Sequence, residues 1–197
     1  MAPTLSALDG SFLRLESEQA HMHVGWSATF AAPGDRERPT LQALRDRAAG
    51  RLHDVPWCRW LLAGAPLGLS EPRWVDDPDF DLAAHVVALT GPDERVSPER
   101  FRALRDAVLS EPLDHSRPLW QILLVPCLQD GRIGMVGKIH HALVDGIAAL
   151  QIVRLVVDDD RDAAARAPEE WRPERRPGPA GWALDGLMRT ASDGVGA

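Results

Sequence analysis

The spacing of apolar residues predicts alternating strands and helices over the first half of the chain. Residues 21–30 alternate apolar and polar side chains and run into a Pro-Gly pair, which predicts a strand followed by a turn. Residues 40–52 repeat apolar side chains at helical spacing with Arg and Asp between them, which predicts an amphipathic helix. Residues 57–90 hold short apolar runs broken by Gly, Pro and Asp, a pattern typical of strands and loops.

The next segment predicts a helix and then a hairpin. Ser97 and Pro98 offer an N-cap and a first-turn proline, and a helix is expected to run from them to about Ser110. The apolar run 119–125 is too short for a typical helix and predicts a buried strand. Asp130-Gly131 is a hairpin signal, so "RIGMVGKIH" is expected to pair antiparallel with that strand.

Residues 147–157 are almost wholly apolar, which predicts a helix packed against a sheet. The composition then changes abruptly. Residues 158–179 are dense in charge and proline and predict a linker, whereas 180–197 carry an amphipathic segment that predicts a docking helix at the tail. The first 157 residues are therefore expected to form one domain, and the residues after them to lie outside it.

Charge and cysteine content narrow the class of protein. The net charge of −7 argues against nucleic-acid binding, which requires dominant clusters of Lys and Arg. Cys58 and Cys127 lie far apart and are expected to be buried thiols in a reducing compartment. The charged N-terminal segment does not resemble a signal peptide, and no apolar run approaches the roughly 18 residues of a membrane span. We therefore expect a cytoplasmic protein, with peripheral contact to a membrane left open.

The stretch "KIHHALVDGIAAL", residues 138–150, holds the groups most suited to chemistry. His140 and His141 are expected between the end of a strand and a buried helix. A neutral imidazole with a pKa near 6.5 can accept a proton from a hydroxyl and return it to a leaving group. Asp145 offers a carboxylate near the helix, and Gly146 leaves room for a substrate to approach. These are the parts of an acid–base site.

Two other interpretations of the same residues stay open at this point. A metal could be bound by His140, His141 and Asp145, with His21 and His23 as distant candidates, although adjacent histidines on an extended backbone point to opposite sides. We expect no metal. Alternatively, both histidines could satisfy turn hydrogen bonds while Asp145 caps the helix. No G-x-S-x-G nucleophile motif is present.

The motif "HHALVDG" at 140–146 resembles the HHxxxDG signature of the CoA-dependent acyltransferase superfamily. Three further stretches resemble, in the same order, the N-terminal half of bacterial wax ester synthase/diacylglycerol acyltransferases; they are "LSALDGSFLRLE" at 5–16, "HMHVGW" at 21–26 and "RPLWQILLV" at 117–125. The resemblance implies an α/β fold with a mixed, largely antiparallel sheet and packed helices, as in the N-terminal half of a chloramphenicol-acetyltransferase-like fold.

The resemblance also implies roles for the four motif residues. His141 would be the general base that deprotonates an acceptor hydroxyl for direct attack on an acyl-CoA thioester, without an acyl-enzyme. His140 would orient the loop, Asp145 would form a structural ion pair and Gly146 would keep the channel open. Trp120 in "PLWQ", together with His21 and His23, is expected to be structural.

The implied reaction transfers a long-chain acyl group to a long-chain alcohol or diacylglycerol. No cofactor is expected, because acyl-CoA is a substrate. Family members carry a second half of similar size across the active-site tunnel, so a complementary C-terminal half is an expected partner. Contact with a membrane or lipid droplet is compatible with lipid acceptors. The alternatives are an inactive truncated fragment and a binding module that holds acyl-CoA or lipid without turnover.

Overall fold

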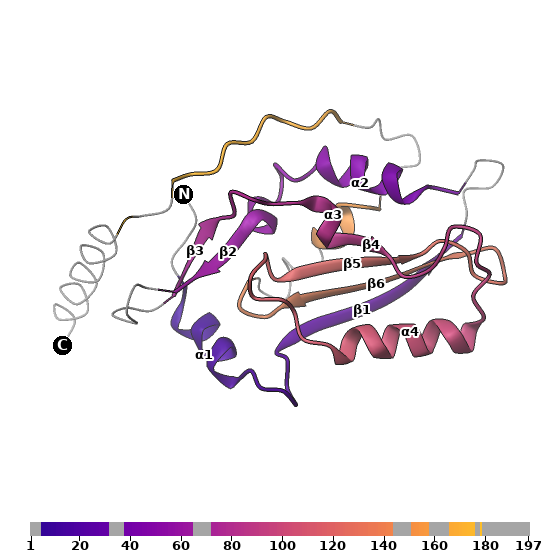
Figure 1. The fold of residues 1–197 in the computed structure, drawn as a ribbon, viewed down its shortest axis with the longest axis horizontal. Coiled ribbons are helices and arrows are strands. Elements are labelled where there is room, and N and C mark those ends of the chain that lie inside the picture. The colour runs from indigo at the N-terminus through magenta and orange to yellow at the C-terminus, as the bar shows by residue number, and fades with distance from the viewer. Residues whose placement is uncertain are drawn as a thin grey trace.

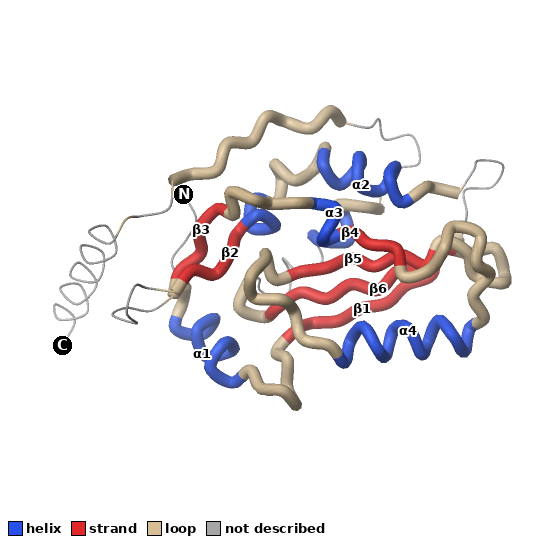
Figure 2. Tube along the Cα trace, in the orientation of Figure 1, coloured by secondary structure: helices blue, strands red, loops and turns tan. Residues whose placement is uncertain are grey.

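The computed structural model describes residues 5–31, 38–64, 72–143, 151–157, 166–175 and 178. Its centre is a four-stranded sheet in the order β1 (His23–Phe30), β6 (Ile133–His140), β5 (Trp120–Val125) and β4 (Val86–Ala88), shown in Figures 1 and 2. Only the β4–β5 pair is parallel within this sheet, since β6 pairs antiparallel with both β1 and β5. A second sheet pairs β2 (Trp60–Ala63) with β3 (Arg73–Asp76). The predicted mixed, largely antiparallel α/β fold is confirmed.

The predicted hairpin forms between β5 and β6. Gly131 has a φ of 82°, a left-handed conformation in which a side chain would be strained. The Gly131 N–H donates to the Leu128 carbonyl at 2.9 Å, and the Asp130 carboxylate accepts from the Arg132 N–H at 3.0 Å. The turn fixes the register, in which Trp120 lies opposite Ile139 and Val125 opposite Gly134. Strand β6 therefore runs through the middle of the sheet, all eight of its residues buried, and ends at His140.

Two predicted helices are confirmed, and each begins after a residue whose side chain caps it. Helix α2 (Leu41–Ala49) begins after Thr40, whose hydroxyl accepts from the Ala43 N–H at 3.1 Å. Helix α4 (Pro98–Ser110) begins after Ser97, whose hydroxyl accepts from the Arg100 N–H at 3.2 Å. Each hydroxyl satisfies a backbone donor that the first helical turn leaves unpaired.

The sheet separates two apolar clusters. On one face, α4 packs Phe101 and Val108 against β5 and β6, in a cluster with Leu123, Val125 and Val136. The other face carries the larger cluster, which includes Trp120, Ile122, Leu124 and Ile139 of the sheet, Leu44 and Ala48 of α2, and Ile152 near the end of the domain. Figure 1 shows α2 and α4 on opposite sides of the strands. Both faces of β5 are therefore covered, as its continuous apolar run requires.

Residues 57–90 form short strands, as expected, together with two short helices, η1 (Pro56–Arg59) and α3 (Leu82–His85). The structure also holds a helix without a sequence prediction, α1 (Ala7–Leu15). It begins with a capping box, in which the Ser6 hydroxyl accepts from the Asp9 N–H and the Asp9 carboxylate accepts from the Ser6 N–H. This reciprocal pair stabilises a helix that buries little of its own surface.

The buried helix expected over 147–157 is described only from Gln151, because residues 144–150 lie outside the described ranges. Helix α5 (Gln151–Arg154) ends earlier than predicted. The guanidinium of Arg51 donates to the carbonyls of Arg154 at 2.6 Å and Val157 at 3.1 Å. These side-chain bonds replace those that a longer helix would make with its own backbone.

The close approach of α4 to β6 gives a stability prediction. A Cβ at Gly134 would lie 2.6 Å from Phe101 Cε2, so Gly134→Ala should lower the free energy of unfolding by about 1–3 kcal/mol through overpacking. The measurement is urea unfolding followed by circular dichroism. Gly91→Ala is the control, because the nearest atom to its Cβ is Glu94 Cβ at 3.9 Å. Equal stability of the two variants would contradict the packing argument.

Candidate active site

The two motif histidines leave the sheet where β6 ends. His140 lies opposite His23 in the β1–β6 register, and its N–H donates to the Leu119 carbonyl at 3.0 Å. The His141 N–H donates to the Met22 carbonyl at 2.9 Å. The backbone of the pair is thus held from the neighbouring strands on both sides, and the predicted position at a strand end is confirmed.

His140 is a fully buried side chain whose tautomer follows from its contacts. Its Nδ1 accepts the Ala142 N–H at 3.0 Å, so the proton of the neutral ring resides on Nε2. Desolvation by burial, together with smaller contributions from the neighbouring histidines His115, His141 and His23, lowers the pKa of His140 to about 4. The ring is therefore neutral near pH 7, and it closes the turn that leads into the loop.

His141 is in a different environment. Its side chain is half-buried, and its ring stacks on Phe12 of α1 with centroids 4.8 Å apart and planes 20° from parallel. None of the described residues forms a hydrogen bond with the His141 ring. Of the two histidines, His141 is the one that a bound hydroxyl could reach, with its plane set by an aromatic neighbour.

The segment His21-Met22-His23 supports His141 from β1. Met22 has a φ of 45°, which is unusual for a residue with a side chain, and its carbonyl is the one that holds the His141 N–H. His21 Nε2 donates to the Ser110 carbonyl at 2.9 Å, and His23 Nε2 donates to the Leu109 carbonyl at 3.1 Å. These contacts support a structural role for both histidines.

Lys138, the single lysine of the chain, completes this support. Its buried ammonium donates to the carbonyls of Val108 at 3.0 Å and Glu111 at 2.9 Å, at the C-terminal end of α4. Desolvation lowers the pKa of Lys138, while the negative charge of Glu111 raises it. A cation at the C-terminus of a helix is favoured by the helix dipole and by the unpaired carbonyls there.

Two residues that sequence patterns did not indicate, Glu16 and His115, lie beside His140. Glu16 is the C-cap of α1, and its Oε2 lies 2.8 Å from His115 Nε2 and 3.7 Å from His140 Nε2. His115 stands in the loop between α4 and β5. That loop is shaped by Asp114, whose carboxylate accepts from the Ser116 hydroxyl at 2.7 Å and from its N–H at 2.9 Å. The signal for Glu16 was its place within the stretch that resembles the family.

The metal set considered from the sequence is not assembled by the described residues. His21 and His23 use their Nε2–H groups on carbonyls of α4, while Asp145 and Gly146 lie outside the described ranges, so their expected roles stay predictions. Instead, the possible ligand atoms of His140, Glu16 and His115 lie within 4.8 Å of one another. A metal at His140 Nε2 would require the ring proton to move to Nδ1, which already accepts the Ala142 N–H.

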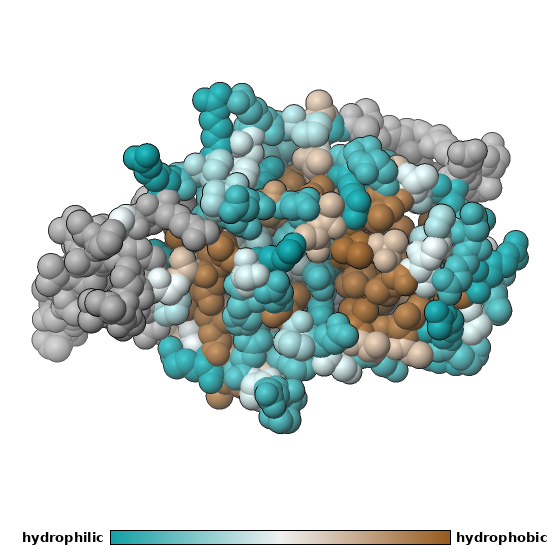
Figure 3. Space-filling view, in the orientation of Figure 1, coloured by the Kyte–Doolittle hydropathy of each residue, from teal (hydrophilic) through white to brown (hydrophobic). Residues whose placement is uncertain are grey.

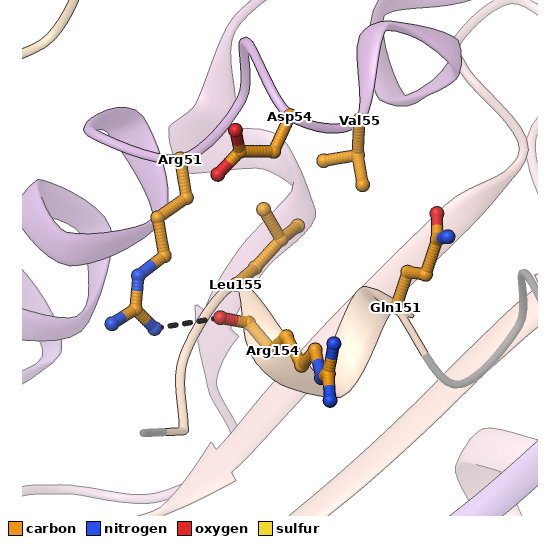
Figure 4. Close-up of a pocket in the computed structure, with 6 residues that line it drawn as sticks. All are labelled: Arg51, Asp54, Val55, Gln151, Arg154 and Leu155. Atoms are coloured by element: carbon orange, nitrogen blue, oxygen red, sulfur yellow. Dashed lines mark hydrogen bonds between the residues drawn. The ribbon is translucent and has the colours of Figure 1, made fainter. Parts of the chain in front are cut away.

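Trp120 and the two cysteines lie in the core. Trp120 is fully buried, donates from Nε1 to the Cys58 carbonyl at 2.7 Å and stacks on His85 with centroids 4.6 Å apart. Cys58 and Cys127 are buried free thiols, as predicted. A pocket elsewhere, between the end of α2 and α5, is lined by Arg51, Asp54, Val55, Gln151, Arg154 and Leu155 (Figure 4). Neither motif histidine lines it.

The fold and the histidine pair at its central strand define the class of protein. The first condensation domain of the calcium-dependent antibiotic synthetase superposes with a TM-score of 0.56 at 17% identity, over 79% of this chain and 36% of that one. This similarity shows the chloramphenicol-acetyltransferase-like fold. Within that class, the model of the wax ester synthase/diacylglycerol acyltransferase catalytic domain matches residues 5–197, and the chain belongs to this family.

Two relatives show how much of the family's length is present. "Probable diacyglycerol O-acyltransferase tgs3" of Mycobacterium tuberculosis is 38% identical over 180 residues, which cover 90% of this chain and 65% of that protein. The wax ester synthase/diacylglycerol acyltransferase of Marinobacter aquaeolei VT8 superposes with a TM-score of 0.66 at 26% identity, over 98% of this chain and 47% of that one. The chain thus spans about half to two thirds of these relatives.

The part of the chain that the structure describes contains no helix with the length and hydrophobicity needed to cross a membrane.

The buried, neutral His140 gives a pH prediction. Its pKa is about 4 in the folded chain against an ordinary 6.5, so the unfolded chain binds the proton more tightly, and stability should fall as the pH decreases through this window. The full difference between the two pKa values corresponds to roughly 3 kcal/mol in the free energy of unfolding. The measurement is urea unfolding at about pH 7.5 and about pH 5.

The control for this prediction is His140→Asn, whose side-chain oxygen can still accept the Ala142 N–H but cannot bind a proton in this range. Burial also lowers the pKa of His23 and His85, so the wild-type protein loses stability from several groups together. The difference between wild type and His140→Asn isolates the His140 contribution. An identical pH dependence in both proteins would show that His140 is not buried in its neutral form.

Proposed function

We propose that this chain forms the N-terminal half of an acyl-CoA-dependent O-acyltransferase, in which His141 is the general base. The acceptor hydroxyl would give its proton to the His141 ring while its oxygen attacks the thioester carbonyl. The tetrahedral intermediate would then expel the CoA thiolate, which takes the proton back. The products are an ester and free CoA, and the ring returns to its neutral form.

The observation that carries this proposal is the difference between the adjacent histidines. His140 is fully buried and its Nδ1 is used by the Ala142 N–H, whereas His141 is half-buried and its ring nitrogens make no hydrogen bond with the described residues. A general base must lie within hydrogen-bonding reach of the hydroxyl whose proton it accepts, and its ring must be held in a fixed orientation. His141 meets the first condition, and its stacking on Phe12 together with its N–H bond to Met22 provides the second.

The relatives support the choice of substrates. The mycobacterial relative is named a probable diacylglycerol O-acyltransferase, and the Marinobacter relative is a wax ester synthase/diacylglycerol acyltransferase. We extend to this chain the transfer of a long-chain acyl group from acyl-CoA to a long-chain alcohol or diacylglycerol. Acyl-CoA is then a substrate, and the reaction requires no cofactor, since a thioester is already an activated acyl donor. Lipid acceptors would favour peripheral contact with a membrane or a lipid droplet.

A complementary second half, on the same polypeptide or on another, is part of the proposal. Among the described residues, Leu8 and Leu15 are the exposed large apolar side chains, with 66% and 63% of their surface accessible. Leu8 and Leu15 are seven positions apart on α1 and therefore lie on one side of this helix. The ring of Phe12, on the same helix, stacks on His141. Figure 3 shows apolar surface from β2 and β3 to α1, beside a second apolar area over the main sheet. Apolar surface of this kind is suited to an interface, and we propose that the second half covers it.

The proposal predicts loss of transfer on removing the base. Release of free CoA from palmitoyl-CoA with hexadecanol or a diacylglycerol should fall about 10²–10⁴-fold in His141→Ala. The assay is run with the chain alone and with the part of the Marinobacter enzyme that this chain does not match. His53→Ala is the matched control, because His53 contacts Asp54 and Glu169, away from the motif.

Each outcome decides a different part of the proposal. Acceptor-dependent release that requires the added half would support a two-part enzyme. Binding of palmitoyl-CoA without release, and equal in wild type and His141→Ala, would instead show a non-catalytic binding module. Release that survives in His141→Ala would contradict the assignment of the base.

A further inference from the structure

The carboxylate of Glu16 lies between two imidazole rings that come from distant parts of the chain. Its Oε2 is 2.8 Å from Nε2 of His115 and 3.7 Å from Nε2 of His140. The side chains of Glu16 and His115 are 15% and 42% exposed, whereas that of His140 is fully buried. A carboxylate oxygen can accept two hydrogen bonds, so one Glu16 can serve both rings.

His140 has a specific need for such an acceptor. Its Nδ1 accepts the Ala142 N–H, which places the ring proton on Nε2. This Nε2 is buried and has no hydrogen-bond partner among the residues that the structure describes. A buried donor without an acceptor costs about 1–3 kcal/mol. Among the residues that the structure describes, the nearest carboxylate oxygen is that of Glu16, and a shift of less than one ångström would bring it within hydrogen-bonding distance.

The same three groups could be viewed as a metal site, but the tautomer argues for the carboxylate bridge. A metal needs the lone pair of Nε2, which is free only if Nδ1 carries the proton. In that form, the Nδ1–H and the Ala142 N–H would face each other as two donors 3.0 Å apart. Metal binding would therefore break the hydrogen bond from the Ala142 N–H that closes the turn after His140. A hydrogen bond from His140 Nε2–H to the Glu16 carboxylate preserves this turn.

We propose that Glu16, bridged to His115, is a positioning residue that holds His140 as the Nε2–H tautomer and thereby fixes the turn that presents His141. The inference rests on the proposed function for its catalytic consequence only. The Glu16 N–H donates to the Phe12 carbonyl at 3.1 Å, and Phe12 stacks on His141. The last turn of α1 thus contacts both histidines, one through an aromatic ring and the other through a carboxylate.

The test compares Glu16→Gln with Glu18→Gln, a matched change at an exposed glutamate in the next turn of chain. The first readout is the tautomer of His140 by two-bond ¹H–¹⁵N correlation on the full chain, with the signal assigned by its loss in His140→Asn. Wild type and Glu18→Gln should show a single Nε2–H ring. Glu16→Gln should show a mixture of tautomers or exchange broadening. The reason is that the glutamine amide can present either its oxygen or its N–H group to His140 Nε2, whereas the carboxylate only accepts.

The second readout is turnover under the conditions in which the wild-type chain releases CoA. Glu16→Gln should lower kcat about tenfold or more with little change in KM for palmitoyl-CoA, since it moves a supporting group and not a substrate contact. His115→Gln keeps a side-chain N–H at the position of Nε2 and should retain more activity than His115→Ala. This rescue by a hydrogen-bonding replacement separates positioning from simple packing.

The outcomes distinguish this inference from the proposed function. A normal Nε2–H signal in Glu16→Gln, with unchanged kcat, would overturn the inference. One-to-one binding of zinc chloride by calorimetry, lost in both Glu16→Gln and His115→Ala, would overturn it in favour of a metal site. If no variant or wild type turns over but the tautomer responds as expected, the positioning role stands and the proposed function fails.

Discussion

The pairing of β6 with strands on both sides is the constraint on which the candidate site depends. All eight residues of β6 are buried, and its neighbours extend the ladder past its end, where Leu119 and Met22 accept the N–H groups of His140 and His141. Each of these hydrogen bonds contributes only modestly to the stability of the fold, but a buried backbone N–H left unpaired here would lower that stability more. The exit point of the histidine loop is therefore set by the sheet and not by the loop itself.

Strand geometry also explains why neighbouring histidines differ so strongly. Successive side chains leave opposite sides of an extended chain, so a pair at a strand end divides between two environments. The buried ring of His140 lies beside Glu16 and His115, where desolvation, with smaller contributions from neighbouring histidines, lowers its pKa to about 4. His141 remains half-buried against Phe12. One ring becomes a fixed structural group, and the other stays available for proton transfer.

The sequence predicted those parts of the fold that local patterns determine. The Asp130-Gly131 turn and the Ser97 cap carry strong short-range signals, and the hairpin and α4 were confirmed at those positions. Helix α1 was not predicted, because Gly10 and Ser11 in its middle have low helix propensity, although Leu8, Phe12 and Leu15 recur at helical spacing. The roles of His140 and His141 rested on family resemblance, and the structure supports their different environments. The bridge from Glu16 to His115 joins residues far apart in sequence and could not be read from spacing.

Helix α1 has contacts that connect the surface of the protein to the site. Leu8, Phe12 and Leu15 follow the spacing i, i+4, i+7 and share one face of α1, so the two exposed leucines flank the ring that stacks on His141, and Glu16 at the end of the helix lies beside His140. A helix of nine residues is only marginally stable by itself, so its position depends on what packs on either side. Binding at Leu8 and Leu15 that orders α1 would then also order Phe12, which lies between them on the helix and stacks on His141. The second half proposed above would, if placed against these leucines, help to fix the plane of the His141 ring without contacting that ring itself.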